Sequence, residues 1–433
     1  MNRFLSNACY IVIIFFTFYD SLLVNCNYTQ FVSFLKIVRY LCYFWLLFSI
    51  FANGYIKKTI IWNYGGCFIL LFAYMILVGL FSLKGFLDYG IEGFMHYKQF
   101  FVFSLMFYFF YYYPQLSGKK YNGLVRKYVF FGTVFSVVNV VLFFSHPSFM
   151  QIPFFDRFSV GYPTVDVVPQ SYCLLASLFY ADIGLNQLKR LVCSLVVFVA
   201  IMMQVSGSGT VFMLIIIFAF ILFASITRNN KKIFALKSNF RNFVVAISVF
   251  SFLGISFITA RFPEIVEKAF PILENRLLTL IGKNNESSLH INTFEIRNNQ
   301  FKKSKRYYED KLIFGTGYGP VSILDGKRQK KEYVFIENQY RHNIIVIGYV
   351  GAMLFILFVA ENLLQSILCK DRLSFKIMYI LSSLIFLLAS NNICTLDILQ
   401  SFVPFCLFWG MRENRKTFKR VRIKVVAEKS NVS

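Results

Sequence analysis

The chemistry-bearing residues of this sequence gather in one polar segment that lies between two strongly apolar regions. Gly315, Gly317 and Gly319 alternate within it, a pattern that suits a tight turn where the backbone must approach another surface or a ligand. The run neither follows a clear strand nor opens a helix, so it does not indicate a dinucleotide site. Glu337 and Asn338 stand directly before the next apolar stretch, where they could form a polar site or cap a helix.

Outside this segment the sequence offers few candidates for catalysis or binding. It has no Walker A loop, so ATP-driven transport by this chain alone is unsupported. Neither a Cys/His ligand spacing nor an Asp-x-Asp pair appears, and we expect no metal and no cofactor. The ionisable residues of the apolar stretches are Asp20, Asp182, Glu361 and Asp397, and most lie near the ends of those stretches, as interface residues do.

The elements that must position these residues are those of a membrane protein. The 433-residue chain is 57% hydrophobic and 15% charged, whereas a soluble chain is typically about 45–50% apolar and about 25% charged. This composition excludes an ordinary cytosolic enzyme. The net charge of +24 does not indicate nucleic-acid binding, because the charges alternate with long apolar runs. Most of the nine cysteines lie in these runs and are interpreted as buried apolar residues.

Hydropathy predicts an all-α polytopic membrane protein with about 12 transmembrane helices and one large external loop between spans 9 and 10. Residues 1–260 would hold nine spans, 261–341 the loop, 342–411 three spans and 412–433 a basic cytoplasmic tail. The first span lacks a signal-peptide cleavage site and is expected to remain uncleaved. The expected spans are residues 8–24, 34–52, 59–83, 98–113, 128–144, 170–185, 191–205, 209–226, 242–260, 342–362, 377–392 and 396–411.

The distribution of Lys and Arg assigns the two membrane faces. Twenty-five of the 45 lie in segments that would be cytoplasmic if both termini are cytoplasmic, and the short segments opposite carry three. Residues 261–341 lie on the external side with 15 basic and 10 acidic residues, and a loop this long is typically functional. We expect it to fold as short helices on the membrane surface. The basic run from Arg412 to Lys424 suits anionic headgroups.

The stretch from Arg297 to Gly351 resembles the large-loop region of the bacterial O-antigen polymerase and O-antigen ligase families. Those families show an Arg, a spacer, an apolar residue before Gly-x-Gly-x-Gly, a variable loop and then a polar pair that enters a span. In this sequence Phe314 is the apolar residue, and nine residues separate the polar pair Glu337-Asn338 from Gly348-Tyr349-Val350-Gly351.

The same comparison favours the polymerases over the ligases. Ligases carry His where this chain has Glu337, and His342-Asn343, the other possible pair, lies only four residues before the Gly-x-x-Gly. Gly161 to Thr164 resembles the families' third external loop, and Ser206 to Thr210 resembles their turn after the seventh span. Ligases commonly carry Arg in that turn, whereas this chain has glycine at 209.

The resemblance implies a reaction in which a sugar hydroxyl attacks the anomeric carbon of a glycan linked to undecaprenyl diphosphate. Glu337 would act as general base and Asn338 would orient a substrate, with helix capping as the alternative role. Arginines would bind the diphosphate, because the planar guanidinium binds phosphate oxygens in pairs; solvated surface charge is their alternative role. The implied substrate-binding residues are Arg276 and Arg297, then Arg157 and Arg341 behind them, with His342 and the glycines 315, 317 and 319.

The resemblance also implies the setting of this reaction. The chain would join lipid-linked oligosaccharide repeat units on the periplasmic face of a bacterial inner membrane, with both termini cytoplasmic. Its partners would be those repeat units, the lipid bilayer and a chain-length regulator protein, with no nucleic acid. Two alternatives stay open: an O-antigen ligase, which transfers glycan to lipid A-core, and a polytopic flippase or transporter of the same lipid-linked unit, which would more often show paired repeats and broken helices.

Overall fold

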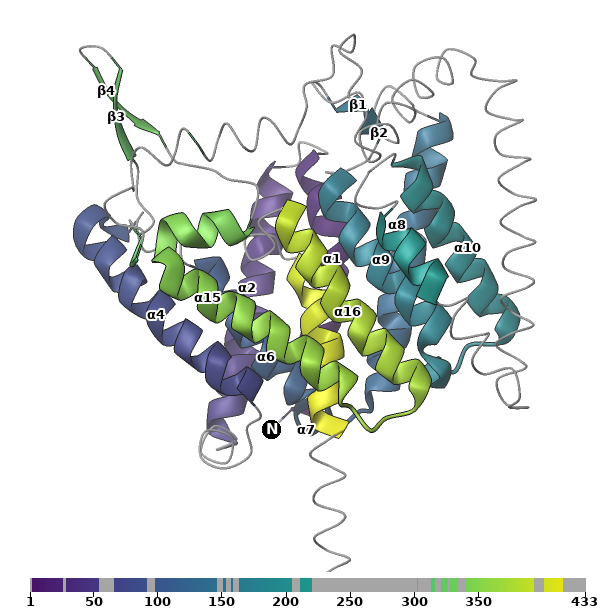
Figure 1. Cartoon of the computed structure of the whole chain (residues 1–433). Helices are drawn as coiled ribbons and strands as arrows, with labels where there is room; N and C mark the ends of the chain where they lie inside the picture. Colours follow the sequence, from purple (N-terminus) through teal and green to yellow (C-terminus); the bar gives the residue numbers. More distant parts are fainter. Residues whose placement is uncertain are drawn as a thin grey trace, which may run out of the picture.

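The computed structural model is a bundle of helices with two short antiparallel hairpins (Figure 1). It describes residues 2–25, 29–53, 66–91, 98–145, 151–152, 157–158, 163–204, 211–219, 302, 313–315, 321–325, 328–332, 339–392 and 401–415. Its helices are α1 (Arg3–Asn25), α2 (Thr29–Ala52), α4 (Gly66–Tyr89), α6 (Lys98–Tyr111), α7 (Tyr113–Ser117), α8 (Tyr121–Ser145), α9 (Pro163–Phe179), the 3-10 turn η2 (Ala181–Ile183), α10 (Gln187–Met203), α15 (Gln339–Ile367) and α16 (Leu373–Asn392), with further helical segments at 211–219 and 401–415.

Five helices in the described part of the chain are long and apolar enough to cross a membrane. Helices cover all or part of every expected span except the ninth, residues 242–260, which lies outside the described residues. The five candidate spans are Phe34–Ala52, Ile69–Leu87, Tyr121–Val141, Gln339–Ile367 and Leu373–Ser390.

The outward faces of these helices are apolar, as a lipid-facing surface requires. Ile69 and Leu80 on α4 are 63% and 61% exposed, and Met353 on α15 is 61% exposed. A water-soluble monomer rarely exposes large contiguous apolar patches. The chain is therefore an α-helical protein whose apolar helices indicate membrane association.

The interior of the bundle is a layer of aromatic rings contributed by helices that are distant in the sequence. Phe386 of α16 stacks on Phe405 with ring centroids 4.1 Å apart and planes inclined by 6°. Phe107 of α6 meets Trp409 edge to face at 4.8 Å. Offset stacking and edge-to-face contacts are the favoured geometries of aromatic pairs. The many Phe residues of the sequence thus hold α6, α16 and residues 401–415 together.

Helix α9 lies earlier in the chain than the expected span at 170–185. It begins at Pro163 and ends at Phe179. Proline suits the first turn of a helix, since its missing N–H would have no partner there. At the other end Arg190 of α10 donates through Nε and Nη2 to the carbonyl of Ser177 and through Nη2 to that of Leu178, at 2.9–3.0 Å. These bonds satisfy the last carbonyls of α9 and end the helix.

Two hairpins lie where the sequence predicted only loops or short helices. β1 (Gln151–Ile152) pairs with β2 (Arg157–Phe158), and β3 (Val321–Asp325) pairs with β4 (Arg328–Glu332). The expectation of short helices is therefore wrong for residues 321–325 and 328–332 of the segment expected to be external. Only two residues, Gly326 and Lys327, separate the paired Asp325 and Arg328 in the sequence, and a two-residue link that begins with glycine is typical of antiparallel hairpins.

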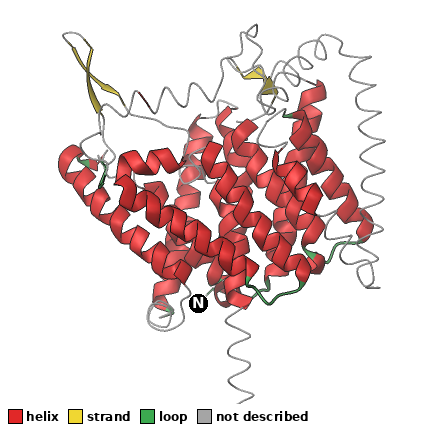
Figure 2. Ribbon diagram, in the orientation of Figure 1, coloured by secondary structure: helices red, strands yellow, loops and turns green. Residues whose placement is uncertain are grey.

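The described turns fall at two opposite ends of the bundle. Figures 1 and 2 show both hairpins at one end and the chain's N-terminus and α7 at the other. At the α7 end, Arg126 donates to the carbonyl of Ile183 at 2.8 Å, and Asp182 pairs with Arg372 at 3.6 Å and Arg415 at 3.8 Å. Asp182 therefore lies in a turn between helices rather than within one.

The interpretation of Arg412 as a headgroup contact is wrong, because its side chain lies inside the bundle. It is 1% exposed and donates to the carbonyl of Asn362 at 2.6 Å, to the Asn362 Oδ1 at 2.9 Å and to Ser366 at 2.5 Å. Glu413 balances its charge at 2.9 Å. The helix of residues 401–415 continues past residue 411, so Arg412 joins it to α15 instead of opening a solvated tail.

Candidate functional site

The structure describes part of the set of site residues that the sequence predicts. Arg341, His342 and Gly315 are described with their surroundings, and Arg157 is described only as a backbone position in β2. The remaining predicted site residues lie outside the described residues and stay predictions: Arg276, Arg297, Gly317, Gly319, Glu337 and Asn338.

Gly315 contacts the backbone of α15 at a break in that helix. Gly348 has φ 69° and ψ −176°, which is not helical, and it divides α15 into residues 339–347 and 349–367. Gly315 has φ 75°, and a Cβ placed there would meet the Gly348 nitrogen and the Val346 carbonyl oxygen. A Cβ on Gly348 would meet the carbonyl oxygen of Ile313. Both positions therefore require glycine.

One hydrogen bond fixes this contact. The Val350 N–H donates to the Ile313 carbonyl at 3.4 Å, across the break. A broken helix leaves N–H groups without partners inside the helix, and an adjoining segment can supply acceptors. The prediction that the alternating glycines allow the backbone to approach another surface is confirmed for Gly315, and the surface is α15.

The first half of α15 buries a group of polar side chains. Gln339, His342 and Asn343 are 0–4% exposed. Gln339 Nε2 donates to Asn343 Oδ1 at 2.9 Å, and the Tyr74 hydroxyl of α4 donates to the same oxygen at 3.4 Å. Asn343 Nδ2 has no hydrogen-bond partner in the described part of the chain. A buried amide with one unsatisfied donor is unusual in a folded protein and suits a polar ligand or an ordered water.

The neighbouring predicted residues do not share this geometry. Arg341, one residue before His342 in the same helix, is half-buried. Tyr340 donates to the Leu387 carbonyl of α16 at 3.1 Å and so fixes the first half of α15 to α16. Glu337 and Asn338 stand two residues and one residue, respectively, before the first described residue of α15, Gln339. The predicted polar pair thus directly precedes the buried polar group.

A second buried polar group lies where α8, α9 and α10 meet. Gln204 donates to Gln170 Oε1 at 2.7 Å, and Gln170 donates to Ser136 at 3.3 Å. Asn139, one turn further along α8, is 3% exposed, and Asp166, one turn before Gln170, is fully buried. These residues border the two sequence motifs at 161–164 and 206–210, of which the structure describes only Pro163 and Thr164, in the first turn of α9.

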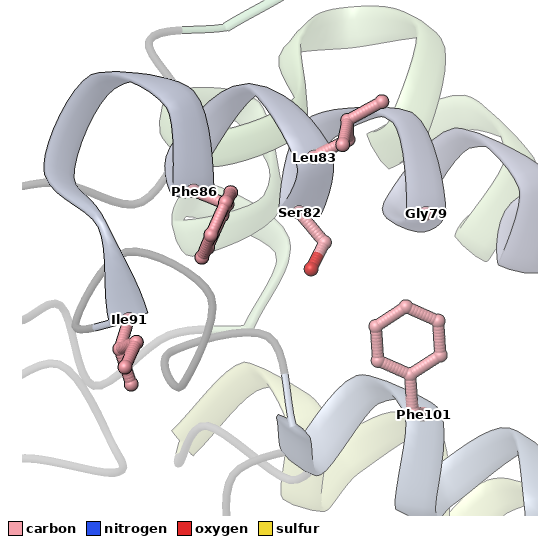
Figure 3. A pocket seen from close by; sticks show the side chains of 6 residues that line it. All are labelled: Gly79, Ser82, Leu83, Phe86, Ile91 and Phe101. Atoms are coloured by element: carbon pink, nitrogen blue, oxygen red, sulfur yellow. The ribbon is translucent and has the colours of Figure 1, made fainter.

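A pocket of about 440 Å³ lies between α4 and α6. Figure 3 shows Ser82 and Phe101 facing each other across it from the two helices. The lining is otherwise apolar and carries no charged group, so it offers neither an acid nor a base. The lining residues are Gly79, Ser82, Leu83, Phe86, Ile91 and Phe101.

The side chains of the two polar groups are suited to hydrogen bonding rather than to metal binding. Within the described ranges, no three His, Cys, Asp or Glu residues gather closely enough to hold a metal ion. Amides and hydroxyls both donate and accept, which suits hydroxyl-rich ligands.

Sequence reasoning missed Gln339 and Gln204 as site candidates, and it considered Asn343 only as part of the less favoured pair His342-Asn343. The i, i+4 spacing of Gln339 and Asn343 places both amides on one helix face, and that signal was present in the sequence. Gln170 and Gln204 carried no such signal, because they lie on different helices and meet only in the fold.

Comparison of the sequence with models of protein families and with curated proteins gives no match.

Proposed function

We propose that this chain is a membrane-embedded glycan polymerase that joins undecaprenyl-diphosphate-linked repeat units at the external face of a bacterial inner membrane. The twelve-span topology, the cytoplasmic termini and the large external loop belong to this proposal. The observation that carries it is the contact of Gly315 with Gly348. It brings together the two glycine elements of the resemblance to the O-antigen polymerase and ligase families, beside the buried polar group of α15.

The proposed reaction is a glycosyl transfer with a lipid diphosphate as leaving group. The hydroxyl oxygen of the acceptor repeat bonds to the anomeric carbon of the growing chain, and the bond from that carbon to the diphosphate oxygen breaks. Glu337 accepts the hydroxyl proton, and Asn338 orients the substrate. Arg276 and Arg297, with Arg157 and Arg341 behind them, balance the charge that develops on the diphosphate. Fixed donors of this kind are worth on the order of 3–4 kcal/mol each.

A deletion strain tests the activity. Lipopolysaccharide from a polymerase null should show core that bears a single repeat, and a plasmid copy of the gene should restore the ladder of longer chains. Bare core with polymer left on its lipid carrier would identify a ligase instead, and repeats trapped on the cytoplasmic face would identify a flippase.

Two substitutions test the predicted catalytic assignment. Glu337→Gln removes the base and should lower the polymerisation rate about 10²–10⁴-fold, and Arg297→Ala should also abolish the ladder. Lys302→Ala is the matched control, because Lys302 belongs to the same external region and is exposed. Full ladders from both variants at normal abundance would show the assignment to be wrong.

A further inference from the structure

The polar group of α8, α9 and α10 contains hydrogen-bonding atoms that nothing satisfies. In the described residues, neither Oδ1 nor Nδ2 of Asn139 has a partner, and Gln204 Oε1 has none. Asn139 is 3% exposed and Gln204 is 1% exposed. Buried polar atoms are almost always paired with protein or with an ordered molecule, because an unpaired atom loses its bonds to water without replacement.

A buried polar contact between α9 and α10, by contrast, is fully hydrogen-bonded. Ser177 of α9 and Ser194 of α10 are also buried, and their hydroxyl oxygens lie 2.7 Å apart. The Ser177 hydroxyl also donates to the Leu174 carbonyl at 2.9 Å. This pair closes on itself and needs no further partner. Among the described residues of α8, α9 and α10 and the residue that follows α10, such unsatisfied side-chain atoms lie only on Asn139 and Gln204.

The unsatisfied group lies toward the end of the bundle that carries the hairpins. Asn139 is six residues before the end of α8, and Gln170 is seven residues after the start of α9. At about 1.5 Å per residue, both lie roughly 10 Å below that end. Gln204 directly follows α10, and β1 and β2 lie in the connection from α8 to α9. The group is thus near the face on which the proposed reaction occurs.

The kinds of unsatisfied atom indicate the class of ligand. Asn139 Nδ2 needs an acceptor, whereas Asn139 Oδ1 and Gln204 Oε1 need donors. A cation would satisfy only the oxygens, and an anion would satisfy only the nitrogen. A hydroxyl group both donates and accepts, so a molecule with several hydroxyls satisfies all three. The buried Asp166, one turn before Gln170, further disfavours a phosphate here.

We propose that Asn139, Gln170 and Gln204 form a binding site for an uncharged sugar residue of the lipid-linked repeat, separate from the arginines that hold its diphosphate. This inference rests on the proposed function and deepens it. Asn139 and Gln204 bind sugar hydroxyls directly. Gln170 holds Gln204 in place through the 2.7 Å bond and is a positioning residue.

The test uses the free repeat oligosaccharide, released from its lipid diphosphate by mild acid, and the purified full-length protein in detergent. Adding the oligosaccharide should raise the thermal midpoint of the wild-type protein. Asn139→Leu keeps the branched shape of the side chain and removes only unpaired atoms, so its midpoint without ligand should equal or exceed the wild-type value. Its oligosaccharide affinity should fall about tenfold, as the loss of two hydrogen bonds predicts. Gln204→Met is the second variant and should also bind the oligosaccharide more weakly.

Ser177→Ala is the matched control, since it removes a satisfied hydroxyl from the same helices. It should lower the thermal midpoint and leave oligosaccharide affinity unchanged. Wild-type affinity in both Asn139→Leu and Gln204→Met would overturn the proposal and leave ordered water as the occupant. A large drop in the midpoint of Asn139→Leu would overturn it in favour of a structural role. If the gene deletion leaves the ladder intact while Asn139→Leu still loses affinity, the polymerase function fails and the sugar site stands.

Discussion

Arg412 shows how a single basic residue can have a structural role that its sequence context hides. It stands at the head of a basic run, yet its guanidinium reaches Asn362 and Ser366 of α15 within the bundle. A buried charge is tolerated only when it is paired and hydrogen-bonded, and Glu413 and the α15 acceptors meet that condition.

Arg412→Ala should destabilise the protein strongly. Loss of the guanidinium removes its ion pair with Glu413 and its hydrogen bonds to α15, and breaking such a buried pair typically costs about 3–5 kcal/mol. Arg372→Ala is the control, because the Arg372 side chain is 76% exposed and its carboxylate partner lies 3.6 Å away, and it should cost about 0–1 kcal/mol. Thermal midpoints in detergent, followed by size-exclusion chromatography, measure both. Equal losses in the two variants would contradict the structural role of Arg412.

At the scale of single residues, the sequence indicated some of the residues that make important contacts, but it did not indicate which polar residues are buried. Gly315 was identifiable because alternating glycines have few other uses in a polar segment. The burial of Arg412 could not be predicted, since its acceptors lie about 50 residues earlier in the chain. The burial of the Asn139 and Gln204 amides could not be predicted either, because a polar residue at one position does not indicate which helices meet there.

At the scale of elements, the break in α15 is the feature that hydropathy could not predict. Residues 339–367 form one apolar stretch, and averaging over a window conceals a single residue with positive φ. The presence of the helices could be predicted, because a run of about 20 apolar residues has few possible structures in a membrane other than a helix. The end of α9 was not, since the Arg190 side chain of the next helix determines it.

Gly348→Ala should separate the segment at residues 313–315 from α15. The new Cβ meets the Ile313 carbonyl, and alanine at this positive φ is strained by about 1–3 kcal/mol. We expect a lower thermal midpoint and faster proteolysis near residue 313. Gly123→Ala is the control, because a Cβ there meets nothing within 4 Å and the residue lies in a helix, so it should be neutral or stabilising. Unchanged proteolysis in Gly348→Ala would argue against the contact.

At the scale of the whole molecule, the arrangement of turns agrees with the charge pattern. The hairpins lie at one end of the bundle, and Arg126, Arg190, Arg372 and Arg415 lie in or beside the turns at the other (Figure 1). These arginines satisfy helix-end carbonyls or pair with Asp182. The residues that predict orientation therefore also bind the helix ends to one another.

Labelling of introduced cysteines tests the proposed sidedness. In a variant that lacks the nine native cysteines, Lys330→Cys on β4 should react with a membrane-impermeant maleimide in cells with a permeabilised outer membrane. Lys119→Cys, between α7 and α8, should react only after lysis, because it lies at the opposite end of the bundle. Labelling of both positions before the cells are lysed would contradict the topology.

The break at Gly348 also has a consequence for how the protein suits its bilayer. The 19 residues from 349 to 367 form about 28 Å of helix, close to the hydrocarbon thickness of about 30 Å. Residues 339–347 are therefore not needed to cross the membrane and can keep their polar side chains at its boundary. If residues 349–367 cross the membrane, they have no length to spare, and we expect hydrophobic mismatch in a thicker bilayer to act first on the glycine contact. Lipid composition would then tune the geometry of the site.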